Sequence, residues 1–247
     1  MGSVASTQEL ARSRPIGSAV VADHQQAGRG RLGRRWEAPA GTALLVSFVL
    51  PYQPLAPLTA GVAAAEACGP GVRLKWPNDL LLEDRKLGGI LVEAARGEGR
   101  EKRFARPPVG GSPPDTPDRC LVGIGINLTW APPGAARLEV DRDLLLDRLS
   151  AELERWWSAP AARVLDAWRA RSDTLGRRVK VELGAETVEG LAEDVADDGS
   201  LIIDGRALAA GDVTHLRAVG ARAGTRDSVS RRPGAAGEDE ERRRAQS

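Results

Sequence analysis

The chain has 247 residues, of which 42% are hydrophobic, so it can bury the core of one large domain or of two unequal ones. Its formal net charge of +1 gives no global field to recruit nucleic acid or a membrane, and no apolar run approaches the roughly 20 residues of a membrane span. The two cysteines, Cys68 and Cys120, lack metal-ligand spacing and are too few for a disulfide scaffold. Because no signal peptide is seen either, we expect a cytoplasmic protein.

Hydrophobic patterning predicts helices and strands along most of the chain. Helices are predicted over residues 3–12, 59–68 and 141–157 and from about residue 160, and strands over 16–22, 42–50, 87–92 and 121–128. Ser6 or Thr7 would cap the first helix, because short polar side chains accept hydrogen bonds from the first turn. For the same reason Thr59 is expected to cap the second helix and Asp141 the third.

Residues 25–36 alternate glycine and arginine without apolar periodicity and predict a loop, which we term the Gly/Arg loop. Glycines let the backbone approach a ligand, and guanidinium groups offer forked donors to phosphate oxygens. Trp36 at its end is a flat surface on which a nucleobase could stack. No Gly-Lys-Ser/Thr follows, so the segment is not a P-loop. The alternative interpretation is an RG-rich disordered segment or a basic patch for nucleic acid.

A second candidate site begins at Lys75-Trp76-Pro77-Asn78-Asp79-Leu80. Arginine is the usual cation of this chain, yet two of its four lysines, including Lys86, and one of its two asparagines fall in or just after this stretch. Lysine offers a compact point charge where arginine offers a planar fork, so a rare lysine indicates a specific need. Asp79 follows a turn and offers oxygens to a metal, and two adjacent glycines in the next strand are typical of close ligand approach. The alternative is a turn and core strand with a chance lysine.

The apolar strand at 121–128 places Gly123, Gly125 and Asn127 on one face, because side chains alternate along a strand. A bare face suits a flat ligand, although close packing on a helix would use the same glycines. The proline-rich residues 95–119, which precede this strand, predict a flexible surface loop.

Short alternating strands with hairpin turns begin at Gly176 and predict a small barrel-like β module. The residues after it contain little apolar content and predict disorder. The expected organisation is therefore a catalytic domain at 1–175, a β module at 176–219 and a tail at 220–247.

Together these features suit the activation of a carboxylic acid by ATP. That reaction must neutralise a triphosphate, align a carboxylate with the α-phosphate and stabilise developing charge. A cationic loop, a flat aromatic, a lone acid and a lysine beside glycine-bearing strands supply these functions. No Ser-His-Asp arrangement is apparent, and His24 and His215 are predicted to be structural or surface residues.

Four blocks in order closely resemble the motifs of biotin–protein ligases. They are Gln26-Ala27-Gly28-Arg29-Gly30-Arg31-Leu32-Gly33-Arg34, Lys75 to Leu80, Lys86-Leu87-Gly88-Gly89-Ile90-Leu91-Val92-Glu93 and Gly123-Ile124-Gly125-Ile126-Asn127-Leu128. Ser6-Thr7-Gln8 resembles that family's Ser-Thr-Asn motif, and the match covers roughly residues 3–219. The resemblance implies an α+β fold: a mixed sheet flanked by helices, like that of class II aminoacyl-tRNA synthetases, followed by an SH3-like β-barrel.

The resemblance also implies a two-step reaction. Biotin and ATP, with Mg²⁺, would form biotinyl-5′-adenylate and release pyrophosphate. The biotinyl group would then pass to one lysine of a biotin carboxyl carrier protein domain, as in acetyl-CoA carboxylase. No winged helix-turn-helix precedes Ser6, so a monofunctional ligase without DNA binding is expected, and a homodimer is left open.

By position in the motifs, Lys86 would meet the biotin carboxylate and the α-phosphate and would be catalytic together with Arg31. The residues implied to bind biotin are Ser6, Thr7, Gln8, Gln26, Gly30, Arg31, Leu32, Lys86, Gly89 and Gly123. Those implied to bind ATP are Arg29, Arg31, Arg34, Trp36 and Asn127. Asp79 would approach magnesium.

Three features depart from the family pattern: Gln8 stands where the family usually has Asn, the 95–119 insert is long, and almost nothing precedes the Ser-Thr motif, where members usually carry a further strand. The alternative functions are a lipoate-type acyl ligase and a non-catalytic biotin-binding module. A nucleic-acid binder using the Gly/Arg loop is disfavoured by the near-neutral charge.

Overall fold

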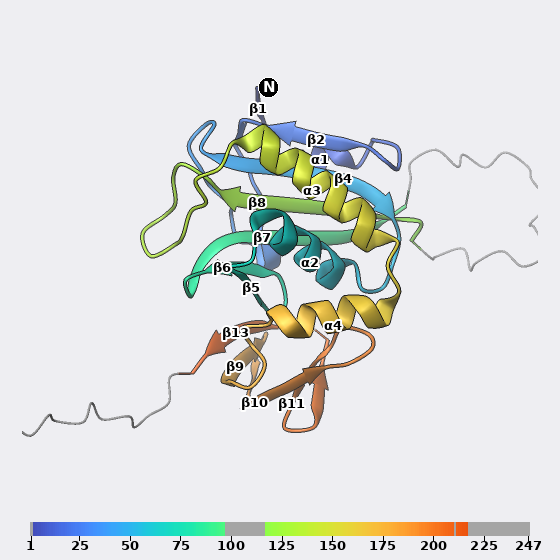
Figure 1. Ribbon diagram of the computed structural model, residues 1–247, viewed down its shortest axis with the longest axis vertical. Helices are drawn as coiled ribbons and strands as arrows, with labels where there is room; N and C mark the ends of the chain where they lie inside the picture. Colours follow the sequence, from blue (N-terminus) through green and yellow to red (C-terminus); the bar gives the residue numbers. More distant parts are fainter. Residues whose placement is uncertain (1, 97–116, 210, 217–247) are drawn as a thin grey trace, which may run out of the picture. The chain divides into compact units, whose positions relative to one another are not determined.

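A six-stranded sheet in the order β2-β4-β8-β7-β6-β5 is the frame of the structure, a computed structural model that describes residues 2–96, 117–209 and 211–216 (Figure 1). Its strands are β2 (Ala19–Ala22), β4 (Ala43–Pro51), β5 (Val72–Lys75), β6 (Asp79–Leu82), β7 (Arg85–Ala95) and β8 (Arg119–Asn127). All its pairings are antiparallel, so this sheet is not the mixed one that the resemblance implies. Parallel pairing joins β1 (Ser3–Val4) to β3 (His24–Gln25) in a separate two-stranded sheet. Residues 97–116 of the predicted flexible loop lie outside the described residues, and the two ends of that prediction, Ala95 and Arg119, belong to β7 and β8. The predicted tail falls wholly outside the described residues.

Strand β4 is apolar except for Ser47, because both of its faces are covered. Val46 and Phe48 belong to the main hydrophobic core. Val49, on the other face, packs with Ala11 of α1 (Thr7–Ala11) in a smaller cluster. A strand buried on both sides reads as a continuous apolar run rather than an alternating one, and this accounts for the pattern seen in the sequence.

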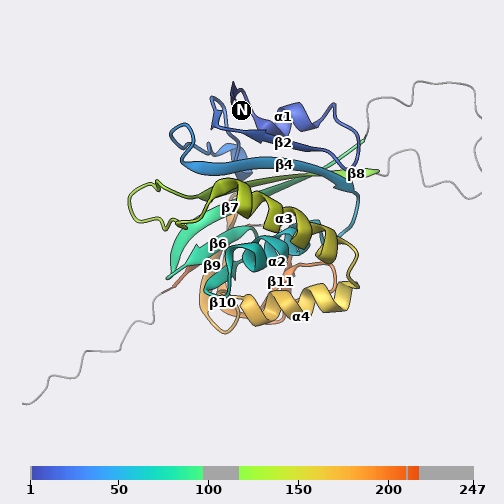
Figure 2. The same ribbon diagram turned by 45° about the horizontal axis from the view of Figure 1, so that its top comes forward.

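Helices α2 (Ala56–Cys68), α3 (Arg142–Trp157) and α4 (Ala161–Arg171) lie on one side of the six-stranded sheet (Figures 1 and 2). The prediction that Thr59 caps α2 is wrong, because the helix begins a turn earlier. Thr59 is fully buried, and its hydroxyl donates to the Leu55 carbonyl at 3.0 Å. Within the described residues, no helix is long and apolar enough to cross a membrane.

The predicted cap of α3 is confirmed, since the Asp141 side chain accepts a hydrogen bond from the Leu144 amide at 2.8 Å. Asp141→Ala is expected to lower the free energy of unfolding by about 1 kcal/mol, because a first-turn amide loses its partner. Urea denaturation of the variant measures this loss. Asp143→Ala, which removes an exposed carboxylate of the same first turn that does not bond a first-turn amide, is the matched control and should cost less. Equal losses in the two variants would contradict the capping role.

The predicted β module is an antiparallel five-stranded sheet in the order β12-β11-β10-β9-β13. Its strands are β9 (Arg178–Leu183), β10 (Glu186–Val195), β11 (Leu201–Ile203), β12 (Arg206–Leu208) and β13 (Asp212–His215). Among the described residues β12 and β13 are its edges, so the expected barrel is an open sheet here. Val181 and Leu201 of the module belong to the same core as β4 and α2. The Trp76 indole also donates to the Gly199 carbonyl at 3.1 Å, so the module packs directly on the turn that precedes Asp79.

Candidate active site

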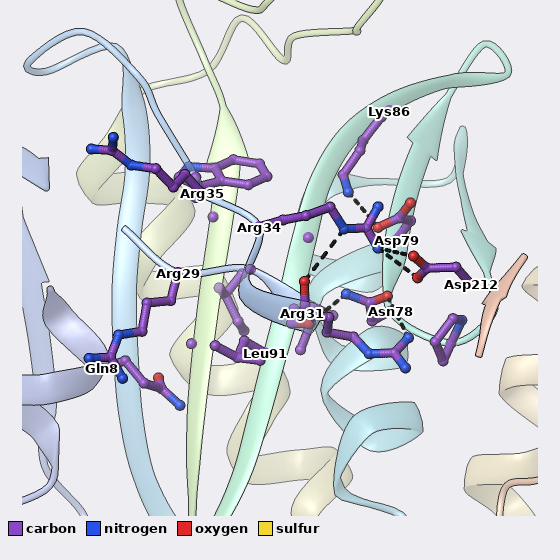
Figure 3. A pocket seen from close by; sticks show the side chains of 18 of the residues that line it. Gln8, Arg29, Arg31, Arg34, Arg35, Asn78, Asp79, Lys86, Leu91 and Asp212 are labelled. Carbon is purple, nitrogen blue, oxygen red and sulfur yellow. Dashed lines mark hydrogen bonds and ion pairs between the residues drawn. The ribbon is translucent and has the colours of Figure 1, made fainter. Parts of the chain in front are cut away.

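A cavity of about 400 Å³ collects segments that are far apart in the sequence. Its walls come from α1, the Gly/Arg loop, β4, the 75–79 turn, β7, β8 and β13. Figure 3 shows Arg29 and Arg35 on one side of this hollow, and Arg31 and Arg34 on the other side with Asp79, Lys86 and Asp212. The predicted site residues that line it are Ser6, Thr7, Gln8, Arg29, Gly30, Arg31, Arg34, Trp36, Asp79, Lys86, Gly89 and Gly123.

Three predicted site residues lie outside this lining. Asn127 is buried, and its amide donates to the Ala136 carbonyl at 2.9 Å, so it holds the segment after β8 instead of facing the cavity. Gln26 is not part of the lining, whereas its neighbour Gln25 is. Leu32 is 73% exposed and lines a second hollow together with the rest of the Gly/Arg loop.

One end of the cavity is a buried polar network. The Gln25 Oε1 atom accepts from the Thr7 amide at 2.7 Å and from the Thr7 hydroxyl at 3.0 Å. The Ser47 hydroxyl lies 2.9 Å from Thr7 Oγ1 and 3.0 Å from Gln8 Oε1. Ser6 is also buried there, and its hydroxyl has no hydrogen-bond partner among the described residues. Because an unpaired buried hydroxyl costs free energy, this end suits a small polar ligand group.

Gln8 fills the bare face of Gly123. A Cβ atom at position 123 would lie 2.6 Å from Gln8 Oε1, so the glycine is needed to admit this side chain. The Gln8 amide donates to Glu93 Oε2 and to the Leu121 carbonyl, both at 3.1 Å. Gln8 therefore closes this end of the cavity, and most of its hydrogen-bonding capacity is already used.

The floor of the cavity is built by Gly89 and Gly125 with the indole of Trp36 against them. A Cβ atom at position 125 would lie 2.6 Å from the Trp36 ring, and one at position 89 would lie 3.5 Å from it. Trp36 Nε1 is buried without a partner among the described residues. The bare strand face predicted for a flat ligand thus carries a flat side chain in this structure.

Cations and carboxylates alternate at the opposite end. Arg31 Nη1 lies 3.3 Å from Asn78 Oδ1 and 3.2 Å from the Gly211 carbonyl. The Lys86 ammonium pairs with Asp79 at 2.6 Å. Burial lowers the pKa of the Arg31 guanidinium, and the nearby Asp212 carboxylate opposes this shift. Arginine stays charged at neutral pH in spite of such shifts, so this end attracts an anion.

Three residues that line or brace the site were not predicted from the sequence: Gln25, Ser47 and Asp212. Ser47 carried a signal, because it is the only hydroxyl-bearing residue of strand β4. Asp212 carried no signal in the sequence, because its strand belongs to the five-stranded sheet, far along the chain from the Gly/Arg loop. Asn78, which the sequence did single out within the 75–80 stretch, lines the cavity.

The fold and the cavity define a site for a ligand that is polar at one end, flat in the middle and anionic at the other. The model of the biotin/lipoate A/B protein ligase family matches residues 4–103, and that of the biotin protein ligase C-terminal domain matches residues 174–216. The biotin–[acetyl-CoA-carboxylase] ligase of Mycobacterium tuberculosis is 37% identical over 234 residues, covering 81% of this chain and 80% of that protein. The Paracoccus denitrificans enzyme of the same name is 34% identical over 209 residues, covering 76% of this chain and 84% of that protein.

A solved structure of the biotin protein ligase from Aquifex aeolicus in complex with biotin and ATP superposes with a TM-score of 0.67 at 26% identity, covering 88% of this chain and 97% of that one. The chain belongs to the biotin/lipoate A/B protein ligase family and is a biotin protein ligase within it. The predicted family and the predicted helix-flanked sheet followed by a small β module are thereby confirmed.

Proposed function

We propose that this chain activates biotin with ATP and transfers it to a lysine of a biotin carboxyl carrier protein domain of the acetyl-CoA carboxylase type. The observation that carries the proposal is that one cavity joins a buried polar end to a cationic end across a glycine floor. The relatives named above, which are biotin–[acetyl-CoA-carboxylase] ligases, support the choice of substrate and acceptor.

In the first step, a carboxylate oxygen of biotin attacks the α-phosphorus of ATP. The bond from this phosphorus to the bridging oxygen breaks, and pyrophosphate leaves with the electron pair. Lys86 would stabilise the charge that develops between the two reactants, because its ammonium stands in the lining beside Gly89. Arg31 and Arg34 would hold the phosphates through their forked donors.

The polar end would hold the ureido group of biotin. Ser6 offers its unpaired hydroxyl, while Thr7 and Gln25 are already fixed by their mutual hydrogen bonds. Such prior ordering lowers the entropic cost of binding. In the second step, the carrier lysine attacks the acyl carbon, AMP leaves, and the amine loses a proton.

The Asp79 carboxylate fits a magnesium ion that arrives with ATP. The described residues contain no group of three or more potential protein ligands that could hold a metal without a substrate. Mg²⁺ is commonly bound by one or two carboxylates together with substrate phosphates, and Asp79 in the lining would be such a carboxylate. When bound, the ion would neutralise phosphate charge.

Incubation of the purified chain with biotin, MgATP and a purified carrier domain tests the proposal. We expect biotin-dependent pyrophosphate release and one biotinyl group per carrier, and a carrier lacking its acceptor lysine should stay unlabelled. Label from lipoate instead of biotin would favour the lipoate-type alternative, and biotin binding without pyrophosphate release would favour a non-catalytic binding module. The cytoplasmic location and a homodimer stay predictions.

A further inference from the structure

The Gly/Arg loop is anchored at its two ends, where Gln25 bonds to Thr7 and the Trp36 indole lies against Gly125. Its tip, residues 30–34, contacts the rest of the protein mainly through Arg31 and Arg34. Its base is a narrow hairpin, in which the Trp36 amide donates to the Gly28 carbonyl at 3.0 Å and the Gly30 amide to the Arg34 carbonyl at 2.7 Å. None of the residues in its short 3₁₀ turn, Arg31–Gly33, is buried. Gly30, Arg31 and Arg34 line both the active-site cavity and the second hollow, so the tip borders open space on two sides.

Strand β13 of the C-terminal module meets the tip of this loop. Arg34 Nη2 lies 2.6 Å from each oxygen of the Asp212 carboxylate. One residue earlier, the Gly211 carbonyl accepts from Arg31 Nη1 at 3.2 Å. Figure 3 shows Asp212 beside the two arginine side chains at the edge of the cavity. Two neighbouring residues of the module therefore hold the two arginines that would face the phosphates.

The backbone at Gly211 is suited to this contact. Its φ of +146° is a conformation that residues with a side chain rarely adopt, and a Cβ atom there would lie 2.4 Å from Val181 of β9. Glycine thus lets the chain pass close over β9, and this path points its carbonyl and the next carboxylate towards the loop.

The contacts leave Arg34 able to bind a ligand. Its Nε atom donates weakly to the Arg31 carbonyl at 3.4 Å, and Nη2 is used by Asp212. Among the described residues Nη1 has no partner, so it stays available for a phosphate oxygen. The ion pair is partly exposed, with 60% of the Arg34 side chain accessible. Such a pair contributes little to folding stability, which suits a contact that must open and close.

We propose that Gly211 and Asp212 are a latch that holds the Gly/Arg loop over the active site, with Asp212 as the positioning residue for Arg34. The inference rests on the proposed function, which it extends by giving the C-terminal module a part in nucleotide binding. Because Arg34 would contact the phosphates both before and during the reaction, loss of the latch should affect ATP binding more than the chemical step.

Hydrogen–deuterium exchange of the full chain without ligand tests the latch independently of activity. In Asp212→Asn, exchange of the amides at residues 29–35 should rise by about two- to fivefold, the range that an exposed ion pair supports. Asp212→Glu should restore slow exchange in part. Glu186→Gln is the matched control, because it breaks an exposed ion pair with Arg206 elsewhere in the same module. Unchanged loop exchange in Asp212→Asn, or an equal rise in Glu186→Gln, would overturn the proposal.

Steady-state kinetics provide a second test of the latch. Asp212→Asn should raise the KM for MgATP by about fivefold with little change in kcat, and this effect should vanish in an Arg34→Ala background because the partner is gone. The same fivefold increase in that background would overturn the latch. If the wild-type chain released no pyrophosphate with biotin, the proposed function would fail instead, while the exchange measurements would still decide the latch.

Discussion

Lys86→Ala is expected to lower biotin-dependent pyrophosphate release by about 10²- to 10³-fold, the loss typical of removing one preorganised group that stabilises developing charge. The Lys86 ammonium stands 2.6 Å from Asp79 and would lie 3.6 Å from a Cβ atom placed on Gly89. Since 42% of the side chain is accessible, the ion pair should contribute only about 0–1 kcal/mol to folding. Single-turnover adenylate formation and thermal melting of the same sample measure the two quantities.

Two further variants test whether the shape of the cation matters and whether the effect is specific to position 86. Lys86→Arg should also be impaired, because a planar fork does not replace a point charge in a close-fitting site. Arg85→Ala removes the neighbouring cation of β7, which is half exposed and pairs with Glu83, and should leave the rate unchanged. A melting temperature that collapses with activity in Lys86→Ala would make the lysine structural, and wild-type activity in Lys86→Arg would contradict the argument from rare lysines.

Local patterns predicted the elements that build the site, because each depends on short-range physics. The run of β4, the glycines of β8 and the cap at Asp141 all follow from side-chain alternation or from the needs of a helix end. The start of α2 was missed for a local reason as well. The prediction began the helix only at Thr59, yet Pro57 lies in its first turn, where the missing amide hydrogen is not needed.

The remaining site residues depend on contacts that no local pattern encodes. Asn127 shares a strand face with Gly123 and Gly125, yet the segment after β8 folds back and its Ala136 carbonyl takes the amide. Glutamines at 25 and 26 are adjacent, and a shift of one residue decides which one faces the cavity. Asp212 reaches Arg34 across 178 positions of the sequence and from another sheet, so only the packing of the module could reveal it.

Gly125→Ala is expected to lower kcat/KM for ATP by about 10- to 100-fold, equivalent to about 1.4–2.8 kcal/mol. The added Cβ atom would lie 2.6–2.9 Å from three atoms of the Trp36 indole, closer than carbon atoms can approach. The indole must therefore shift, and it ends the hairpin that carries the Gly/Arg loop, since the Trp36 amide donates to Gly28. A displaced loop base would misplace the arginines that hold the phosphates. Initial rates at varied ATP, with biotin saturating, measure the loss.

Gly89→Ala is the matched control on the same floor. Its Cβ atom would lie 3.5 Å from Trp36 and 3.6 Å from the Lys86 ammonium, which are ordinary contacts, so we expect a loss of about threefold or less. If Trp36 mediates the effect, adding Gly125→Ala to a Trp36→Ala background should cost little more, because the ring that clashes is absent. Equal losses in Gly125→Ala and Gly89→Ala would contradict the role given to the clash with the indole. A full further loss in the Trp36→Ala background would instead mean that Gly125 itself meets the ligand, as the bare strand face first suggested.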